Sequence, residues 1–525
     1  MSKRRARGSA RILPTTGVAP DKNGRGFFGP VRVGVSREAL AFPGLRAFAL
    51  RHPLAVSLVL YGVVAALLRP ATWSTPLFED PAQNLYVGQA IFDGGTPYVD
   101  AANNNGPLTF LLFGVLGVLV GTSNALLKFT VVIVTAAAAA LVASYVSRYA
   151  GRAVGLLAGL TFALFSSTAD LLGYEPMTEV YALVPMTAAW YLASRGGARS
   201  AAGAGAAATV AVLMNPAFGI IVPIAGLELW RRGRENGTIG ELFGWAVVAG
   251  SFVASIVLFW VAAAGAIDDM VTQVFGHITS DGGGAPESSQ AFSAETSGLY
   301  RFVTTPAGGL WIAAAIGAIL AWRRPTLRPL AVPSLLWLAL AFVRVKVGDH
   351  ELYHEFLLAL PGIAVGIAAG IASLWGPGLR HRVAIAALVL AAPVVTLVIG
   401  PQWRSLQLPA SERFGVDTSS AVAEPVADFI KENTAPEDRI FVGGRAAQVY
   451  WLAERKAPTR FFDDYPVVQE AKYKRERGRA LGDDPPAAIV IMPNTPPDDA
   501  LRAFIARLRY QLAFEERGAR VYLKF

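Results

Sequence analysis

Long apolar runs alternate with short polar segments along most of the chain. The runs are about 15 to 25 residues long, as membrane-spanning helices are, and lack the period of two that the strands of a membrane barrel show. The first span is expected at 54–68. The later spans are expected at about 125–146, 153–169, 180–193, 201–213, 217–230, 241–264, 306–321, 329–345, 352–374 and 382–400. The pattern predicts an α-helical multi-spanning membrane protein.

The apolar run from Pro107 to Val120 complicates this count. As a complete span it would invert every later loop and place the loop arginines outside, against the positive-inside bias. As a partial or paired segment it leaves the basic loops on the cytoplasmic side, at 148–152, 195–199, 231–234, 323–328 and 380–382. We therefore expect about 11 to 13 transmembrane helices between residues 51 and 400, with a first external loop at 70–106.

The pattern changes to that of a soluble segment from about Gln402. Apolar positions there have helical and strand periods in turn. Helices are expected at 420–432, 446–455 and 497–509, and strands at 439–443, 487–492, 511–515 and 520–524. Residues 401–525 are therefore predicted to form a small extracytoplasmic α/β domain.

Composition supports a membrane location. Of the 525 residues, 53% are hydrophobic and 16% charged, and the mean hydropathy is +0.43. The net charge of +9 comes from Lys and Arg in residues 1–50 and in the loops, so it indicates topology, and no nucleic-acid partner is expected. Residues 1–50 have no long apolar core and are interpreted as a cytoplasmic basic tail. Together with the repeated apolar runs, this predicts a multi-pass protein of the plasma or inner membrane. The chain has no cysteine, which excludes disulfides and thiolate chemistry.

Two adjacent acids, Glu79 and Asp80, follow the first span. Neighbouring carboxylates near a membrane raise the pKa of at least one of them, which suits a general base. The alternative is a pair of solvated loop residues. Further along the loop, Asn84 to Phe92 is expected to form a short amphipathic helix at the interface.

A second acidic pair, Glu175 and Glu179, is four residues apart. A helix that begins near Pro176 would place both at its outer end, where they could bind a metal ion or orient a hydroxyl group. The alternative is that they complement the helix dipole.

A cluster of cations lies between two later spans, at Arg344, Lys346, His350 and His354. Arginine binds phosphate oxygens through two hydrogen bonds and lysine acts as a point charge, so the cluster suits a phosphate group. Arg and Lys that extend from the span to the membrane interface are the alternative.

The other motifs of the chain do not indicate a further functional site. No nucleotide-binding or hydrolase motif stands in a supporting context. Gly443-Gly444-Arg445 has a geometry able to hold an anion, but an ordinary strand-to-helix turn is expected. Asp463-Asp464 could bind a cation, but a solvated loop is expected.

One combination of motifs resembles a known family. Asp80, Gly95-Thr96-Pro97-Tyr98-Val99-Asp100 and Gly106-Pro107-Leu108 are similar to the first external loop of membrane glycosyltransferases of the C superfamily, which includes protein O-mannosyltransferases and lipid A aminoarabinose transferases. Pro176 to Glu179, Asn215-Pro216 and His350 to Pro361 fit as well. In place of a basic residue before the Gly-Pro-Leu step, this chain has Asn103-Asn104-Asn105.

The resemblance implies transfer of a hexose or pentose from a polyprenyl phosphate to a lipid, glycan or protein acceptor, with inversion. Asp80 matches the family's base, with Glu79 beside it. Arg344, Lys346, His350 and His354 are expected at the donor phosphate. Glu179, Glu175, Asp100 and Tyr98 are expected to orient the acceptor or a divalent metal ion. The alternatives are a flippase for lipid-linked sugars and an envelope glycan polymerase or ligase.

Overall fold

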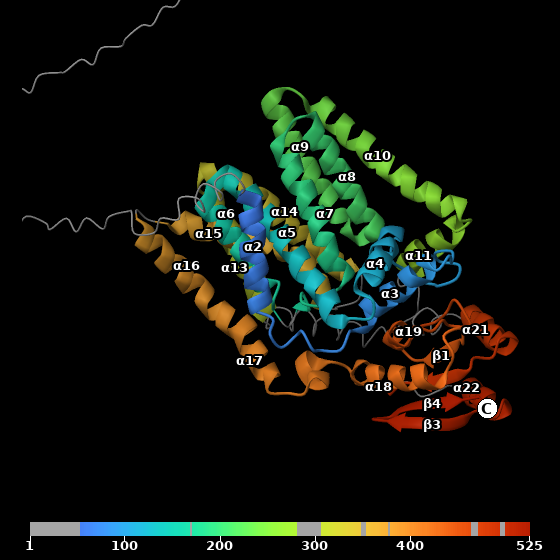
Figure 1. Ribbon diagram of the computed structural model, residues 1–525. Helices are drawn as coiled ribbons and strands as arrows, with labels where there is room; N and C mark the ends of the chain where they lie inside the picture. Colours follow the sequence, from blue (N-terminus) through green and yellow to red (C-terminus); the bar gives the residue numbers. More distant parts are fainter. Residues whose placement is uncertain are drawn as a thin grey trace, which may run out of the picture. The chain divides into compact units, whose positions relative to one another are not determined.

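The computed structural model describes residues 53–168, 171–280, 306–347, 353–375, 378–463, 471–493 and 499–524 (Figure 1). The tail predicted at 1–50 lies outside these residues. Each of the eleven expected spans coincides with a helical segment. The helices of this part are α2 (Pro53–Leu67), α5 (Asn124–Ala150), α6 (Arg152–Phe165), α7 (Thr178–Arg195), α8 (Ala198–Met214), η2 (Pro216–Ile220), α9 (Ile221–Asn236), α10 (Ile239–Ala263), α13 (Pro306–Trp322), η3 (Pro325–Leu327), α14 (Arg328–Val347), η4 (Tyr353–Ala359), α15 (Leu360–Leu374) and α16 (Leu379–Pro393).

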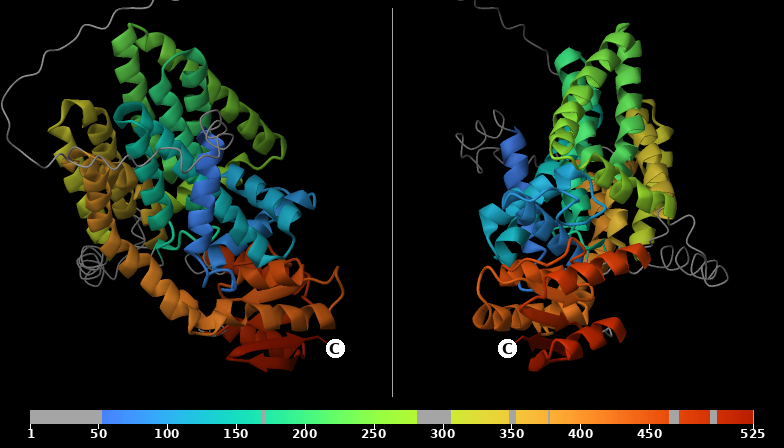
Figure 2. Two further views of the ribbon diagram at one scale, coloured as in Figure 1. Left: turned by 60° about the vertical axis from the view of Figure 1, so that its left-hand side comes forward. Right: turned by 90° about the vertical axis from the view of Figure 1, so that its right-hand side faces the viewer.

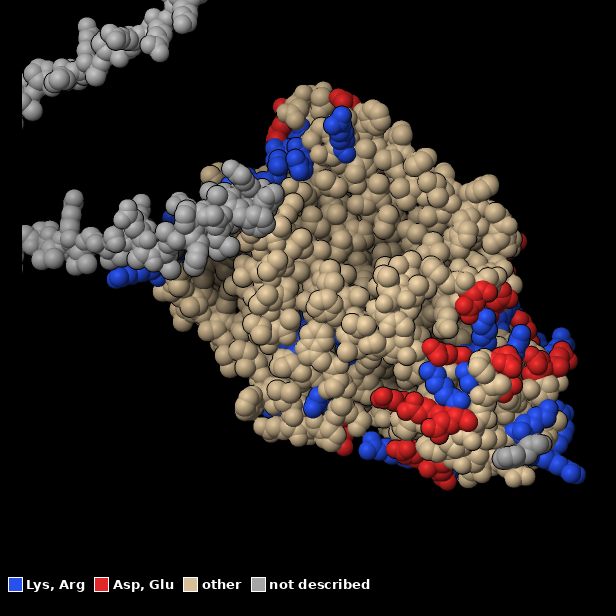
Figure 3. All heavy atoms as spheres, in the orientation of Figure 1, with Lys and Arg blue, Asp and Glu red and all other residues tan. Residues whose placement is uncertain are grey.

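Several of these helices can cross a bilayer. Within the described residues, five helical segments are long and apolar enough by themselves, at Asn124–Ala150, Ile239–Ala263, Pro325–Arg344, Phe356–Leu374 and Arg380–Leu406. Figure 3 shows that this helical part of the visible face is almost free of Lys, Arg, Asp and Glu, which gather at the end of α9 and over the C-terminal elements. A wide uncharged surface of this kind suits lipid, so the protein is a multi-pass membrane protein.

Glycines allow the helices to approach closely. A Cβ atom on Gly370 of α15 would collide with the backbone of Gly317 on α13, and one on Gly88 would collide with the backbone of Gly114. Small residues at such crossings bring helix backbones into contact where lipid offers no hydrophobic driving force.

The first external loop is more helical than expected. Helix α3 spans Glu79–Phe92 and so begins five residues before the predicted start at Asn84, which places Glu79 and Asp80 in its first turn and not in a solvated loop. Helix α4 (Pro107–Val120) packs against α3 and is 14 residues long, short for a complete crossing. The expectation of a partial or paired segment agrees with this length.

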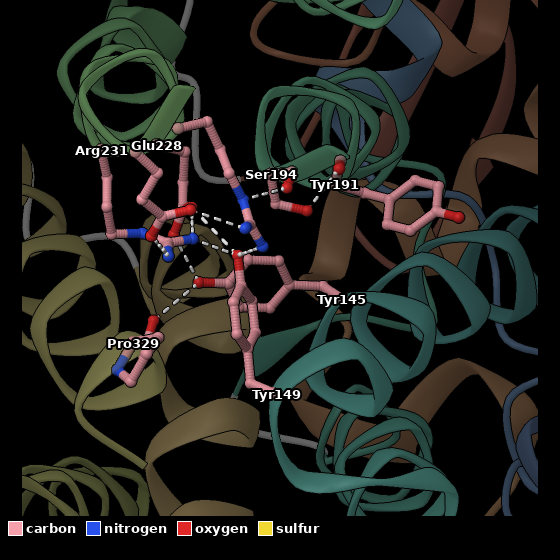
Figure 4. A network of polar contacts seen from close by, with 9 residues as sticks. Tyr145, Tyr149, Tyr191, Ser194, Glu228, Arg231 and Pro329 are labelled. Carbon is pink, nitrogen blue, oxygen red and sulfur yellow. Dashed lines mark hydrogen bonds and ion pairs between the residues drawn. The ribbon is translucent and has the colours of Figure 1, made fainter. Parts of the chain in front are cut away.

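A buried polar network ties together α5, α9 and α14 (Figure 4). The side chain of Glu228 is 0% exposed and accepts hydrogen bonds from Tyr145 (2.7 Å) and Tyr149 (3.2 Å) and from Arg231 (2.6 Å). The Tyr145 hydroxyl also lies 3.1 Å from the carbonyl oxygen of Pro329. Because a buried carboxylate is costly without partners, this network specifies how the helices meet.

The C-terminal segment contains a four-stranded mixed sheet in the order β1-β2-β4-β3 (Figure 2). Its elements are α17 (Gly400–Leu406), η6 (Ala410–Gly415), α18 (Thr418–Asn433), β1 (Ile440–Gly443), α19 (Ala447–Ala453), α21 (Ala471–Asp483), β2 (Ala488–Ile491), α22 (Asp499–Arg507), β3 (Gln511–Glu516) and β4 (Ala519–Leu523). Strand β2 is parallel to β1 and antiparallel to β4. All predicted strands and helices are present, and α21 was not predicted.

Both faces of the sheet are buried at strands β1 and β2, whereas β3 is mostly exposed. Ala488 and Val490 of β2 belong to the main core, whereas Ile489 and Ile491 pack with residues of α21 and α22. The alternation follows from the period of two in a strand. Helices and a small sheet thus pack together in this segment, and the boundary of a separate domain at residue 401 stays a prediction.

Candidate functional site

The candidate site begins at the first turn of α3. Phe78 is extended and precedes the helix, and Glu79 and Asp80 follow as its first two residues. Acids at this end complement the helix dipole, and Pro81 is tolerated in the first turn because its missing N–H would have no helical partner. The local sequence therefore places both carboxyl groups at one end of α3.

Glu79 and Asp80 have different environments. The Glu79 side chain is 17% exposed, and its Oε1 accepts hydrogen bonds from Gln83 and from Arg445 Nε, both at 2.7 Å. Asp80 is 42% exposed and has its Oδ1 atom 3.8 Å from Arg445. The two acids thus differ in access to a substrate.

The protonation of Glu79 is perturbed. Burial raises the pKa of Glu79 to about 9, the carboxylates of Asp463 and Asp80 act in the same direction, and Arg445 opposes the shift. Burial thus favours the protonated form of Glu79, and Asp80 is the more exposed member of the pair. Two carboxyl groups in different environments commonly divide acid and base roles in this way.

The C-terminal domain contributes to this cluster. Asp463 is 4% exposed and its Oδ2 accepts a hydrogen bond from Gln83 at 3.0 Å, so the expectation of a solvated loop was wrong for Asp463. Asp464 lies outside the described residues. Gly443-Gly444-Arg445 forms the strand-to-helix turn that was expected, between β1 and α19.

The asparagines of the first external loop form a chain of amide hydrogen bonds. Asn105 donates to Asn84 at 3.0 Å and accepts from Asn215 at 3.0 Å, and Asn84 donates to Thr178 at the start of α7. Asn103 accepts from the backbone and side chain of Asn105. These contacts hold α3, the loop, α7 and the break between α8 and η2 together.

Tyr98 and Asp100 serve the structure of the same loop. Tyr98 is 0% exposed, packs edge-on against Phe110 and donates its hydroxyl hydrogen bond to the carbonyl oxygen of Asn105. Asp100 Oδ2 accepts a hydrogen bond from the Thr96 N–H at 2.6 Å. The predicted role of both residues in orienting an acceptor has no support in these contacts.

Glu175 is part of a buried ion pair. Helix α7 begins at Thr178, so Glu175 precedes it and does not share a helical face with Glu179. Glu175 Oε1 lies 3.0 Å from Lys128 Nζ, and Lys128 also donates to the carbonyl oxygens of Thr72 (2.9 Å) and Thr75 (2.7 Å). This cluster joins α5 to the two segments that lead into α3 and α7.

Glu179 is different from Glu175. It lies half-buried in the first turn of α7 and makes no hydrogen bond or ion pair with the residues that the structure describes. It is therefore the better candidate for contact with a substrate.

The predicted phosphate cluster is only partly visible. Arg344 lies near the end of α14 and is half-buried. His350 and the side chains of Lys346 and His354 lie outside the described part of the structure. η4 packs against α14 and α7.

No metal site is evident among the described residues. No three of their His, Asp and Glu side chains are grouped as a metal site requires. The predicted divalent metal ion therefore has no identified ligand set, and no chemistry is assigned to it below.

The fold matches solved structures of membrane glycosyltransferases. The crystal structure of ArnT from Cupriavidus metallidurans bound to undecaprenyl phosphate is matched over 92% of this chain and 99% of that chain, with a TM-score of 0.57 and 13% identity. The chain has the fold of ArnT. ArnT in the apo state gives a TM-score of 0.56 at 12% identity, over 89% of this chain and 97% of that one.

Other comparisons add little to the ArnT match. The oligosaccharyltransferase AglB from Archaeoglobus fulgidus, in complex with an inhibitory peptide and a dolichol-phosphate, matches at a TM-score of 0.47 and 13% identity, over 84% of this chain and 70% of that one. No family model and no curated protein sequence matches the chain. The ArnT match extends from the helical part into the C-terminal segment, and it shows a likeness of fold.

Sequence reasoning missed three residues of the site. The first turn of α3, with Glu79 and Asp80, is called the acidic turn below. Gln83 and Asp463 hold the acidic turn in place, and Arg445 pairs with it. The absence of any Lys, Arg or His from residues 70–106 could have indicated that a cation must come from elsewhere, because the same segment has four acids.

Proposed function

We propose that the protein transfers a sugar from a polyprenyl-phosphate donor to an acceptor hydroxyl at the external face of the membrane. The observation that carries this proposal is the unequal pair at the start of α3, where a half-exposed Asp80 stands beside a largely buried Glu79. The fold supports it, because an ArnT structure with that fold was bound to undecaprenyl phosphate.

Asp80 takes the role of base in this reaction. Its carboxylate accepts the proton of the acceptor hydroxyl while the hydroxyl oxygen attacks the anomeric carbon of the donor. The bond from that carbon to the phosphate oxygen breaks, and the lipid phosphate leaves with the electron pair. A single displacement of this kind inverts the anomeric configuration.

Other residues bind and orient the substrates in this proposal. Arg344, Lys346, His350 and His354 face the phosphate of the donor, where positive charge stabilises the leaving group. Glu179, half-buried and close to the amide chain of the loop, orients the acceptor.

The proposal places the N-terminus in the cytoplasm and the C-terminal domain outside. Direct contacts support one side for the domain and the first external loop: Tyr86 of α3 accepts a hydrogen bond from the Ala457 N–H at 2.9 Å, and the Ala102 N–H donates to the carbonyl oxygen of Arg460 at 2.9 Å. The proposed domains are the tail at 1–50, the transferase domain at 51–400 and the α/β domain at 401–525.

The test compares Asp80→Asn with Asp93→Asn. Asp93 lies just after α3, is 40% exposed and pairs with Lys456, so it matches Asp80 in exposure and in charge. Purified protein in liposomes is given a panel of radiolabelled polyprenyl-phosphate pentoses and hexoses with an envelope extract as acceptor. Asp80→Asn should keep the wild-type melting temperature and lose about 100-fold or more in transfer activity. Asp93→Asn should keep both the melting temperature and the transfer activity.

Equal transfer by Asp80→Asn and Asp93→Asn would overturn the assignment of Asp80 as the base. A wild-type protein that moves the labelled lipid across the bilayer without any transfer would overturn the proposed transferase function and indicate a flippase. If transfer is observed, mass spectrometry of envelope lipids and glycans with and without the protein would identify the sugar and its acceptor.

A further inference from the structure

The first external loop does not balance its own charge. Residues 70–106 contain Glu79, Asp80, Asp93 and Asp100, and no Lys, Arg or His. Unpaired carboxylates near a membrane are costly, so cations must reach them from other parts of the chain.

The C-terminal domain supplies these cations. Arg445 Nε lies 2.7 Å from Glu79 and a second Arg445 nitrogen lies 3.8 Å from Asp80, while Lys456 lies 3.0 Å from Asp93. Arg445 is thus the cation that structure and distance assign to the acidic turn.

The turn before α19 aims Arg445 at the acids. Strand β1 ends at Gly443, and Gly444 has a φ of +112°, a conformation that residues with a Cβ atom rarely adopt. Helix α19 packs against α3, and its Gln448 donates to the carbonyl oxygen of Leu77 at 3.3 Å. The position of Arg445 is therefore fixed by the backbone on both sides.

The asparagines that precede Gly106 cannot replace this cation. Asn103 and Asn105 are neutral, and their amides are engaged with one another, with Asn84 and with Asn215. They fix the loop, and the positive charge comes from another domain.

The charged groups that face the acidic turn form a small set. Asp463 and Arg445 approach from the C-terminal domain. Of the two helices packed on α3, α4 has no titratable side chain and α19 has only Tyr450. Among the described residues, Arg445 therefore supplies the positive charge next to Glu79 and Asp80.

We propose that Arg445 is a positioning residue of the transfer site, supplied to the first external loop by the C-terminal domain. It holds the Glu79 carboxyl group against α3 and keeps positive charge beside Asp80. This inference rests on the proposed function. It makes the C-terminal domain a part of the active site.

The test is the pH profile of transfer by Arg445→Gln and Arg445→Lys, with the polyprenyl-phosphate sugar that the wild-type protein uses. Without Arg445 the acidic group takes up protons at higher pH, so the acidic limb of kcat should move upward and transfer at the foot of that limb should fall about 10-fold or more. Arg445→Lys keeps the charge and should restore the position of the limb.

Two control variants separate charge from structure. Arg520→Gln removes an arginine of equal exposure, 52%, that pairs with Glu515 inside the domain. Arg460→Gln removes a docking contact, since Arg460 lies 2.8 Å from Asp269 of α11 (Ile267–Ser280). Neither control should move the acidic limb, although Arg460→Gln is expected to lower the melting temperature.

The outcomes distinguish this inference from the proposed function. If Asp80→Asn abolishes transfer while Arg445→Gln keeps the wild-type profile, or loses transfer equally at every pH, the positioning role of Arg445 is overturned alone. If the wild-type protein shows no transfer, the proposed function fails first, whereas retained transfer in Asp80→Asn overturns only the assignment of Asp80 as the base.

Discussion

The Lys128 ammonium group lies 3.0 Å from Glu175 Oε1, with the two side chains 2% and 0% exposed. Because Lys128 also donates to Thr72 and Thr75, the pair holds the segment before α3 against α5. The buried ion pair therefore helps to fix the position of the segment that leads into Glu79 and Asp80.

Lys128→Met should destabilise the protein by about 3–5 kcal/mol, because it leaves the Glu175 carboxyl group buried without its cation. The double variant Lys128→Met/Glu175→Leu should recover much of this loss. Equilibrium unfolding in detergent measures both free energies. A double variant as unstable as the sum of its single variants would contradict a coupled pair.

The stability of the protein should depend on Glu79 between pH 5 and 9. Its pKa is raised from 4.5 to about 9 in the folded state. In this range the folded protein binds more protons than the unfolded chain, so the free energy of unfolding falls as pH rises. Glu79→Gln removes this contribution.

Melting temperatures of wild type and Glu79→Gln across this range measure the effect. The difference between the two curves should change with pH, and Glu515→Gln, which alters a half-exposed acid of the domain, should run parallel to wild type. Parallel curves for Glu79→Gln would show that Glu79 titrates normally.

Gly106→Ala should weaken the first external loop. The Gly106 N–H donates to the carbonyl oxygen of Met214 at 2.8 Å, and a Cβ atom there would collide with the carbonyl oxygen of Leu213. The backbone must then move, and we expect a loss of about 1–3 kcal/mol together with lower transfer. Gly244→Ala on α10 has nothing within 4 Å of its new Cβ atom and serves as the control.

Glu228→Leu should be among the most destabilising single changes in the helical part. It leaves Tyr145, Tyr149 and Arg231 without their shared acceptor, at a cost of about 3–5 kcal/mol. Glu235→Gln removes a 45% exposed acid that pairs with the same arginine and should change stability by less than about 1 kcal/mol. Unfolding of both variants in detergent tests this, and equal losses would contradict it.

The sequence was informative where structure follows from local pattern. Apolar runs located the spans, and short apolar or alternating runs located β1 to β4. The position of Asp80 after the first span identified Glu79 and Asp80 as candidate site residues. Helix α21 was missed because Ala471–Asp483 is rich in charge and has few apolar positions to show a helical period.

Contacts between distant residues could not be read in the same way. Lys128 lies inside a predicted span, and nothing in its neighbourhood points to Glu175. Arg445 meets Glu79 across 366 positions of the chain, through a turn that looked ordinary. Such pairs depend on how domains dock, which a single sequence does not reveal.

The docking of the C-terminal domain has a consequence for biosynthesis. Asp463, the hydrogen-bond partner of Gln83, lies 380 residues later in the chain. Arg445, the partner of Glu79, lies 366 residues after it. At about 5–20 residues per second, a ribosome needs about 20–80 s to make the intervening chain. During that time residues 70–106 lack their contacts with Arg445 and Lys456, so the arrangement at the start of α3 is completed only when translation is nearly finished.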